Sequence, residues 1–275
     1  MGKPGCRVSA VQSLEAGSHA GGGGHEPSSA VGRASFAGVG RSGPVSDPRR
    51  LAGVSASRQL TGQHSVRYGS PEELHEIIRE SVGEPQVVLC IPDGQAAVVG
   101  SRQATDLVVG DADVKVVRRR SGGGLVLVDP DAAVWIDVVV PPGDERFGSD
   151  VRSGMIEVGR RWRRALIALG ADPDRIAVHE GEMRTSAWGD LLCFAGVGTG
   201  EVLFDGAKLV GISQRRSSAV LRFQCQVHRE DPTDRLMRLI GDRPTGEPMR
   251  PAVLGDVVGP AVDGQAVAAA LAAEF

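Results

Sequence analysis

The chain has 275 residues and a formal net charge of −3, with 41% hydrophobic but only 4% aromatic residues. This length allows one large domain or two small ones, built around an aliphatic core. The small negative charge gives no general case for nucleic acid or an anionic membrane as a partner. We find neither an apolar run long enough to cross a bilayer nor a signal peptide, so the cytoplasm is the expected location.

Residues 1–65 differ from the rest of the chain in composition. They are rich in Gly, Ser, Ala and Arg, include four consecutive glycines at 21–24, and lack hydrophobic periodicity. Such a segment cannot bury enough apolar surface to offset its ordering entropy. We therefore expect a disordered tail over residues 1–65 and a single folded domain over residues 66–275.

The first predicted element of the folded part is a helix. Ser70 is placed as its N-cap, Pro71 at the first helical position and Glu73 for a capping box, and we expect the helix to run to Val82 and end at Gly83. Short β-branched runs bounded by turn residues follow, which are typical of strands. These runs predict strands over 87–91, 96–100, 114–117, 125–128 and 134–140.

A long helix is expected next, over residues 150–169, because apolar side chains recur along it at helical spacing. Trp162 lies on this apolar stripe and is expected in the core. Arginines at 160, 161, 163 and 164 flank the stripe. They could form a phosphate-binding patch, but a solvated helix face is the commoner case and is our interpretation.

The second half of the chain again groups its strands together. Strands are expected over 191–194, 201–204, 207–214 and 219–227, followed by helices over 233–240 and 264–273. Asp205-Gly206 predicts a tight hairpin between two of these strands, because both positions tolerate positive φ. Since strands cluster rather than alternate with helices, we predict an α+β fold, with a mixed or antiparallel sheet flanked by helices.

An arginine- and glycine-rich stretch, residues 118–124, joins two of the predicted strands. Three consecutive glycines between strands cost conformational entropy and need a reason. The expected reason is close approach of the backbone to a ligand, because bare N–H groups beside guanidinium groups suit a phosphate or a carboxylate. A flexible basic turn is the alternative interpretation.

Lys208 follows the predicted hairpin turn. Lysine occurs at only three positions, 3, 115 and 208, among 31 basic residues, so a retained lysine weakly favours a need for its compact charge. The ammonium lies either at the rim of the sheet or in a pocket with an anion. Alternation along the strand predicts which side chains share its face: Val210, Ile212 and Gln214, with Gly211 and Ser213 opposite.

The cysteines and histidines predict no metal site. Cys6, Cys90, Cys193 and Cys225 form no CxxC pair, and no Cys/His cluster has zinc-ligand spacing. Cys90 and Cys225 fall inside apolar strands and are expected to be structural. His228 could accept a proton, but a lone histidine at a strand end is usually solvated.

Three segments, in this order, resemble motifs of the lipoate–protein ligases. They are Val98–Gln103, the Arg-Arg-x-Ser-Gly-Gly-Gly type segment from Arg118 to Asp129, and the Asp-Gly-x-Lys hairpin from Phe204 to Gln214. The resemblance covers roughly residues 69–258. It implies the catalytic domain shared by biotin and lipoate protein ligases and octanoyltransferases.

The resemblance implies an enzyme that activates lipoate or octanoate with ATP and Mg²⁺ as an acyl-adenylate. It then attaches the acyl group to a lysine on the carrier domain of a 2-oxoacid dehydrogenase or of the glycine cleavage system. Lys208 would stabilise the charge of the intermediate electrostatically. The residues implied in holding substrate or adenylate are Arg102, Arg119, Arg120, Ser121, Gly122, Gly123, Gly124, Gly206, Gly211 and Ser213.

The chain departs from the family pattern at three places, which leaves alternatives open. Only Asp129 remains of a His-Asp-x-Gly-Asn pattern, and Thr199-Gly200-Glu201 stands where ligases often have Arg-Asn-Asp. Many bacterial ligases have a C-terminal accessory domain that supports adenylation; since this chain ends soon after the expected catalytic domain, we expect ATP activation either to need a separate accessory subunit or to be absent. An octanoyltransferase that forms a thioester at Cys193 without ATP is the main alternative. A non-catalytic binder of a lipoyl carrier or small acid is the other, and such a binder would not need Lys208.

Overall fold

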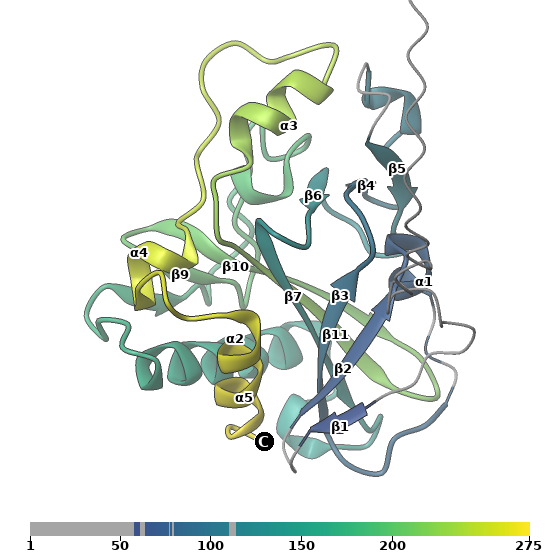
Figure 1. The fold of residues 1–275 in the computed structure, drawn as a ribbon, viewed down its shortest axis with the longest axis vertical. Helices are drawn as coiled ribbons and strands as arrows, with labels where there is room; N and C mark the ends of the chain where they lie inside the picture. Colours follow the sequence, from purple (N-terminus) through teal and green to yellow (C-terminus); the bar gives the residue numbers. More distant parts are fainter. Residues whose placement is uncertain (1–57, 61–63, 77, 79, 110–113) are drawn as a thin grey trace, which may run out of the picture. The chain divides into compact units, whose positions relative to one another are not determined.

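The computed structural model describes residues 58–60, 64–76, 78, 80–109 and 114–275. An eight-stranded sheet forms the centre of this part, and a three-stranded sheet packs over one of its faces (Figure 1). In spatial order, the large sheet contains β1 (Arg58–Leu60), β2 (His64–Gly69), β3 (Gln86–Pro92), β7 (Ala133–Val140), β11 (Leu221–His228), β10 (Ala207–Arg216), β9 (Val202–Phe204) and β8 (Ile176–Val178). The small sheet contains β5 (Lys115–Arg118), β4 (Ala96–Val99) and β6 (Val126–Val128).

Both sheets are mixed. Only β2 with β3 and β4 with β5 pair in parallel, and all other neighbours are antiparallel. The predicted α+β class, with a mixed sheet and flanking helices, is confirmed. Strands β1 and β2 begin before residue 66, inside the range predicted as a tail, whereas residues 1–57 lie outside the described part.

Two helices cover the face of the large sheet opposite the small sheet. They are α2 (Val151–Ala168) and α5 (Gly264–Ala272), which pack against each other and against the main apolar core (Figure 1). Trp162 is fully buried there, as predicted. Shorter helical elements are α1 (Pro71–His75), α3 (Thr233–Leu239), α4 (Leu254–Val258) and 3₁₀ turns at Thr105–Leu107, Glu145–Phe147 and Cys193–Ala195. Within the described residues, no helix has both the length and the apolar character that crossing a bilayer requires.

Helix α1 is much shorter than the sequence predicts. The Ser70 cap and its Glu73 capping box are present, but the chain turns extended at Glu76 rather than continuing to Val82. The buried Arg222 guanidinium donates hydrogen bonds to the carbonyls of Leu74 and Glu76. Those carbonyls are therefore satisfied by a side chain of β11 instead of a further helical turn.

The predicted strand over residues 191–194 is wrong. Only Leu192 forms a bridge, with Leu125, and the chain then turns at Cys193–Ala195 because Ala195 N–H donates to Leu192 O. The other predicted strands and the helices α2, α3 and α5 are present, with ends shifted by up to two residues. The sequence interpretation missed β1, β2, β8 and α4, which are at most six residues long and show no clear periodicity.

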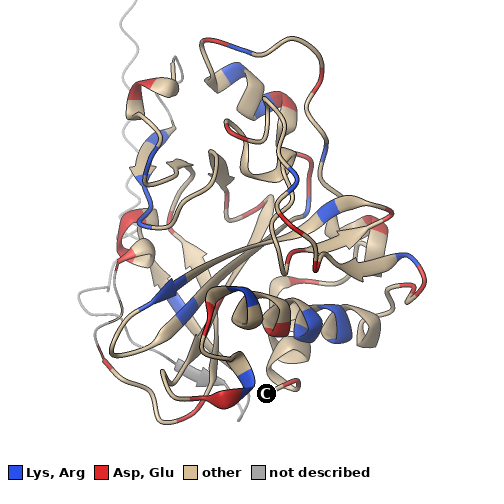
Figure 2. Ribbon diagram, turned by 180° about the vertical axis from the view of Figure 1, so that it is seen from behind, with Lys and Arg blue, Asp and Glu red and all other residues tan. Residues whose placement is uncertain are grey.

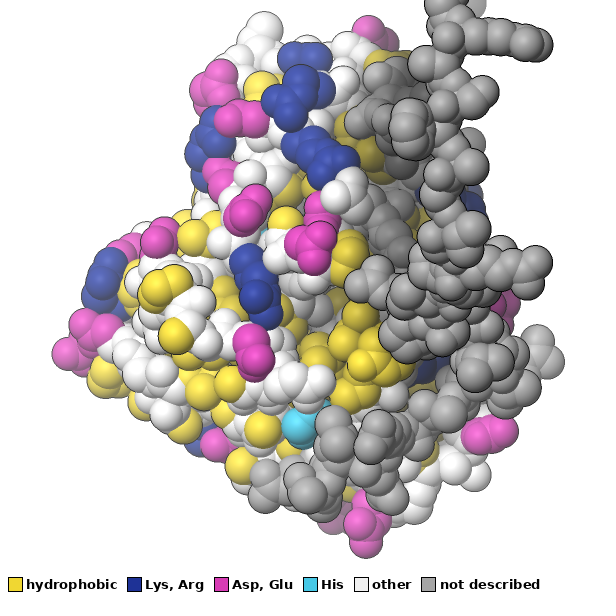
Figure 3. All heavy atoms as spheres, viewed as in Figure 1, with side chains coloured by type: hydrophobic (Ala, Val, Ile, Leu, Met, Phe, Trp, Pro, Cys, Tyr) yellow, Lys and Arg dark blue, Asp and Glu magenta, His cyan; other side chains and the backbone are white. Residues whose placement is uncertain are grey.

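Three arginines of α2 pair with carboxylates, which offsets part of the run of positive charge on that helix (Figure 2). Arg160 pairs with Glu180, Arg164 with Glu274, and the largely buried Arg161 with Glu157. Arg160 and Arg164 are exposed, as expected of a solvated helix face, whereas Arg161 is buried. On the face shown in Figure 3, basic and acidic side chains are likewise interspersed in the upper part, with hydrophobic side chains below them.

Candidate functional site

A cavity of about 740 Å³ lies between the large sheet and the loops of the small sheet. It is lined by both the glycine loop, which we define as residues 122–124, and Lys208, although these are far apart in the sequence. Predicted site residues that line the cavity are Arg102, Arg119, Gly122, Gly123, Gly124, Cys193, Lys208, Gly211 and Ser213. Predicted site residues outside its lining are Arg120, Ser121 and Gly206.

Two of the three glycines of the loop, Gly123 and Gly124, are required by the protein itself. Gly123 has a φ of +94°, which strongly favours glycine. A Cβ on Gly124 would lie 2.7 Å from the backbone N of Cys193. A Cβ on Gly100 would lie 1.9 Å from the carbonyl oxygen of Gly123. Of the three loop glycines, only Gly122 has open space around a built Cβ. Close backbone packing, rather than a ligand, therefore explains why a glycine is needed at position 124.

Arg119 holds this loop in place. It is 5% exposed, and its guanidinium donates to the carbonyl oxygens of Gly122, at 2.9 and 3.2 Å, and of Gly124, at 2.8 Å. These contacts orient the loop carbonyls toward the arginine. The backbone N–H groups of Gly122, Gly123 and Gly124 have no acceptor among the described residues. Free successive N–H groups are the feature of this loop that suits an anion.

Lys208 lies on the face of β10 opposite to the one predicted. The pairing of β10 with β9 shifts register between Lys208 and Val210, which is a β-bulge. The extra residue reverses the alternation, so Lys208 shares a face with Gly211 and Ser213 and faces the cavity. Leu209 and Val210 both enter the apolar core on the other side of the sheet.

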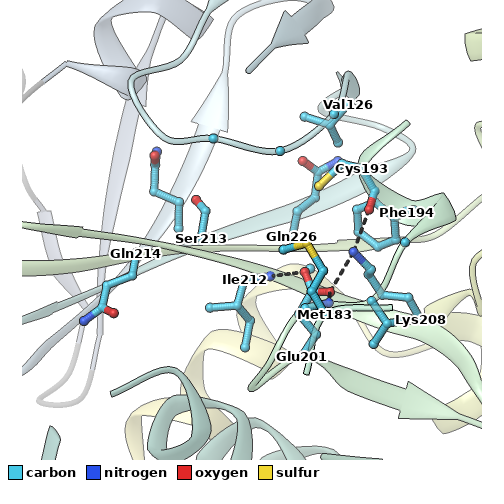
Figure 4. Close-up of a pocket in the computed structure, with 18 of the residues that line it drawn as sticks. Val126, Met183, Cys193, Phe194, Glu201, Lys208, Ile212, Ser213, Gln214 and Gln226 are labelled. Carbon is cyan, nitrogen blue, oxygen red and sulfur yellow. Dashed lines mark hydrogen bonds and ion pairs between the residues drawn. The ribbon is translucent and has the colours of Figure 1, made fainter. Parts of the chain in front are cut away.

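The ammonium of Lys208 is buried and held by two polar neighbours (Figure 4). The side chain of Lys208 is 3% exposed, and its Nζ lies 2.7 Å from Glu201 Oε2. Nζ also donates to the carbonyl oxygen of Cys193 at 2.6 Å and lies 5.2 Å from the centre of the Phe194 ring. Of the two environments that the sequence left open, the structure shows the pocket rather than the rim.

Glu201 is the site residue that the sequence interpretation missed. Its Oε2 accepts from the N–H of Gly198 at 2.6 Å, and its Oε1 accepts from the N–H of Ile212 at 3.2 Å. Both carboxylate oxygens are therefore fixed, and the residue is 4% exposed. The available signal was its position after Thr199-Gly200, where the family often has an acidic residue.

Cys193 stands apart from the other described cysteines, because it is only partly buried and lines the cavity. Its Sγ would lie 3.9 Å from a Cβ built on Gly123, so the thiol faces the glycine loop. Cys90 and Cys225 are buried, as predicted for structural cysteines, and burial raises the pKa of both thiols. Cys6 lies outside the described residues.

Two histidines near the cavity are buried rather than solvated. Burial lowers the pKa of His228 to about 3, with the Lys208 charge adding to this effect. His228 packs edge-on against Phe194 and is 1% exposed, so the expectation of a solvated histidine is wrong. Burial also lowers the pKa of His75 to about 4. His75 lines the cavity and packs on Trp135 with ring centres 4.3 Å apart.

Three arginines line the exposed side of the cavity: Arg102, Arg152 and Arg184. Arg152 is tied to the neighbouring chain through Glu180 O and Thr199 Oγ1. None of the three has a carboxylate partner among the described residues. In the same part of the chain, no group of three His, Cys, Asp or Glu side chains is placed to hold a metal ion.

The chain has the mixed α+β fold of solved lipoate–protein ligases. The chain belongs to the lipoyl protein ligase A/B catalytic domain family, whose family model matches residues 70–275. A comparison with curated proteins found no match.

Solved structures share the fold at low sequence identity. Lipoate-protein ligase A bound with ATP is 20% identical, with a TM-score of 0.52, over 71% of this chain and 73% of that chain. A putative lipoate protein ligase from T. acidophilum with bound lipoic acid is 18% identical, with a TM-score of 0.52, over 71% and 73%. The bi-partite lipoate protein ligase of Thermoplasma acidophilum, studied with its E2 lipoyl domain, is 18% identical, with a TM-score of 0.50, over 71% and 71%.

Proposed function

We propose that the chain attaches a lipoyl or octanoyl group to a lysine of a lipoyl carrier domain, using ATP to activate the acid. The observation that carries this proposal is the single cavity shared by the Lys208 ammonium and the free N–H groups of the glycine loop. Its volume of about 740 Å³ lies within the usual range for small-molecule sites. The carriers would be those of 2-oxoacid dehydrogenases or of the glycine cleavage system.

In the first step, a carboxylate oxygen of the acid attacks the α-phosphorus of ATP. A new phosphorus–oxygen bond forms, the bond to pyrophosphate breaks, and pyrophosphate leaves with the bonding electrons. Negative charge grows on the phosphoryl oxygens as this happens. The N–H groups of the glycine loop and the nearby Arg102 would hold that charge, because preorganised donors favour the transition state.

In the second step, the neutral amine of the carrier lysine attacks the acyl carbon of the adenylate. The amide bond forms, the bond between carbon and the AMP oxygen breaks, and the amine gives up a proton to solvent. Lys208 would donate a hydrogen bond to oxygen atoms that gain charge in both steps. Its role is electrostatic rather than nucleophilic, because Glu201 and Cys193 O hold it as an ammonium donor.

Among the described residues, two carboxylates line the cavity, Glu201 and the exposed Asp190, and neither belongs to a group of three potential metal ligands. Magnesium bound with nucleotides takes only one or two protein carboxylates, alongside phosphates and waters. Glu201, which is buried at the cavity, already binds Lys208 and two backbone N–H groups. We therefore assign no residue and no step to the metal.

A second candidate function rests on the position of Cys193. A thiol that lines the cavity could accept octanoyl from a carrier protein as a thioester and pass it to the target lysine without ATP. Lys208 donates a hydrogen bond to the backbone carbonyl of the same residue.

One experiment separates these functions. Apo carrier domain is incubated with the protein and octanoate or lipoate, with and without ATP, and separately with octanoyl carrier protein, and its mass is measured. Modification that requires ATP and survives Cys193→Ser supports the ligase. Modification from the thioester donor, lost in Cys193→Ser, supports the transferase. Binding of the carrier without modification under any condition would support a non-catalytic binder and remove both catalytic proposals.

A further inference from the structure

The buried ion pair between Lys208 and Glu201 has a role of its own. We propose that Glu201 is a positioning residue, which fixes the Lys208 ammonium against the cavity. Lys208 is 2% exposed and Glu201 4% exposed, and the ion pair measures 2.7 Å. The catalytic consequence rests on the proposed function, but the positioning itself can be tested without any reaction.

Glu201 is held rigidly enough to position another side chain. Its two carboxylate oxygens accept from backbone N–H groups on both sides, those of Gly198 and Ile212. The Ile212 contact comes from β10, the same strand that carries Lys208. Glu201 therefore fixes the ammonium relative to that strand and cannot rotate away without leaving two donors unpaired.

The turn that carries Glu201 is shaped by close backbone packing. Gly200 has a φ of +86°, and a Cβ on it would lie 2.4 Å from backbone atoms of Met155 in α2. A Cβ on Gly159, also in α2, would lie 2.0 Å from the carbonyl oxygen of Gly200. Helix α2 and the turn thus meet backbone to backbone, which fixes where Glu201 enters the cavity wall.

The remaining neighbours of Lys208 do not supply a second counter-charge. They are the carbonyl of Cys193, the Phe194 ring and His228, and the pKa of His228 is lowered to about 3 by burial, so that this ring is neutral. Gly211 leaves room for Phe194, since a Cβ there would lie 3.0 Å from the ring. An ammonium has three N–H donors, and the two polar partners leave one for a substrate oxygen.

A buried ammonium that loses its carboxylate partner becomes unfavourable as a charge. Replacing Glu201 with Gln keeps the size of the side chain but removes that charge. The ammonium then loses the partner that holds it against the cavity wall. This loss reduces its ability to donate a hydrogen bond to the substrate.

The sharpest test uses the scarcity of lysine, which occurs only at 3, 115 and 208. With ¹³C label at the lysine ε-carbon, the full chain gives three signals, and Lys208→Arg identifies the one from Lys208. In Glu201→Gln, the Lys208 signal should move away from its wild-type position. Glu201→Asp should shift it less, in the same direction.

Matched variants control for general effects. Glu180→Gln removes an exposed carboxylate paired with Arg160 and should leave the Lys208 signal in place. Asp137→Asn breaks the other buried ion pair, with Arg222, so it should lower stability without moving that signal. A Lys208 signal that is unchanged in both Glu201 variants would overturn the positioning role.

Activity provides the second readout. Glu201→Gln should lower kcat by about 10-fold to 100-fold, while the KM for the acid changes much less, because the affected donor acts in the transition state. Glu201→Asp should recover part of the loss. An equal loss of kcat in Asp137→Asn would show that the effect is general destabilisation. If the wild type proves inactive with every donor, the proposed function fails, whereas the spectrum still decides whether Glu201 positions Lys208.

Discussion

Substituting alanine for Gly124 tests whether the glycine loop is shaped by the protein or by its ligand. The new Cβ would lie 2.7 Å from Cys193 N and Leu192 C, and 2.8 Å from Leu191 C. All three are backbone atoms, so no side-chain rotation relieves the contact. The loop must move away from residues 191–193, against which its backbone packs.

The expected cost follows from the contacts that this movement breaks. Leu125 N–H donates to Leu191 O at 2.6 Å, and Leu125 O accepts from Cys193 N–H at 2.9 Å. Losing these two hydrogen bonds costs about 1 kcal/mol each, and strain in the packed wall adds about 1 kcal/mol or more. We therefore expect Gly124→Ala to lower the free energy of unfolding by about 3 kcal/mol, measured by urea denaturation.

Gly122→Ala is the matched control, because it makes the same chemical change two residues away. No atom lies within 4 Å of a Cβ built on Gly122, and its φ is not positive. Its free energy of unfolding should change by less than about 1 kcal/mol. Equal destabilisation by the two variants would refute the assignment of Gly124 to backbone packing.

Three further predictions concern the groups around the cavity. Arg119→Lys should lower the free energy of unfolding by about 2 kcal/mol, because an ammonium cannot bridge two loop carbonyls; unchanged urea denaturation would contradict this. Lys208→Met or Glu201→Gln alone should lower the free energy of unfolding by about 3–5 kcal/mol, and the double variant should lower it by clearly less than the sum of the two. Additive losses would show that the two side chains are not coupled. Because burial lowers the pKa of His75 from 6.5 to about 4, the unfolded chain binds its proton more readily. The free energy of unfolding should therefore fall as the pH drops from 6.5 toward 4, and it should fall less steeply in His75→Gln. Equal pH dependence in the wild type and in His75→Gln would show that His75 is not the cause.

The elements with strong local signals were predictable from the sequence. The apolar stripe of α2, the Ser70 capping box and the Asp205-Gly206 hairpin all have the predicted form, and Asp205 and Gly206 both adopt positive φ. These features depend on residues close together in the chain. Hydrophobic periodicity and turn residues were therefore enough to predict the helix, its cap and the hairpin.

The errors arose where distant residues decide the local structure. Helix α1 ends early because Arg222, far along the chain, takes its carbonyls. The bulge that turns Lys208 toward the cavity comes from the register between β10 and β9, which alternation along one strand cannot show. Glu201 was missed for the same reason, since its importance appears only once Lys208 lies beside it.

The most direct test of the central claim is the affinity of a non-hydrolysable acyl-adenylate analogue, such as an octanoyl sulfamoyl adenosine, measured by calorimetry. If the glycine loop and Lys208 surround one adenylate site, the analogue should bind at least about 100-fold more tightly than octanoate or AMP alone, because it joins both halves of the intermediate. Lys208→Met should remove most of that gain while a folded protein remains. Absence of binding, or equal affinity in wild type and Lys208→Met, would contradict the account.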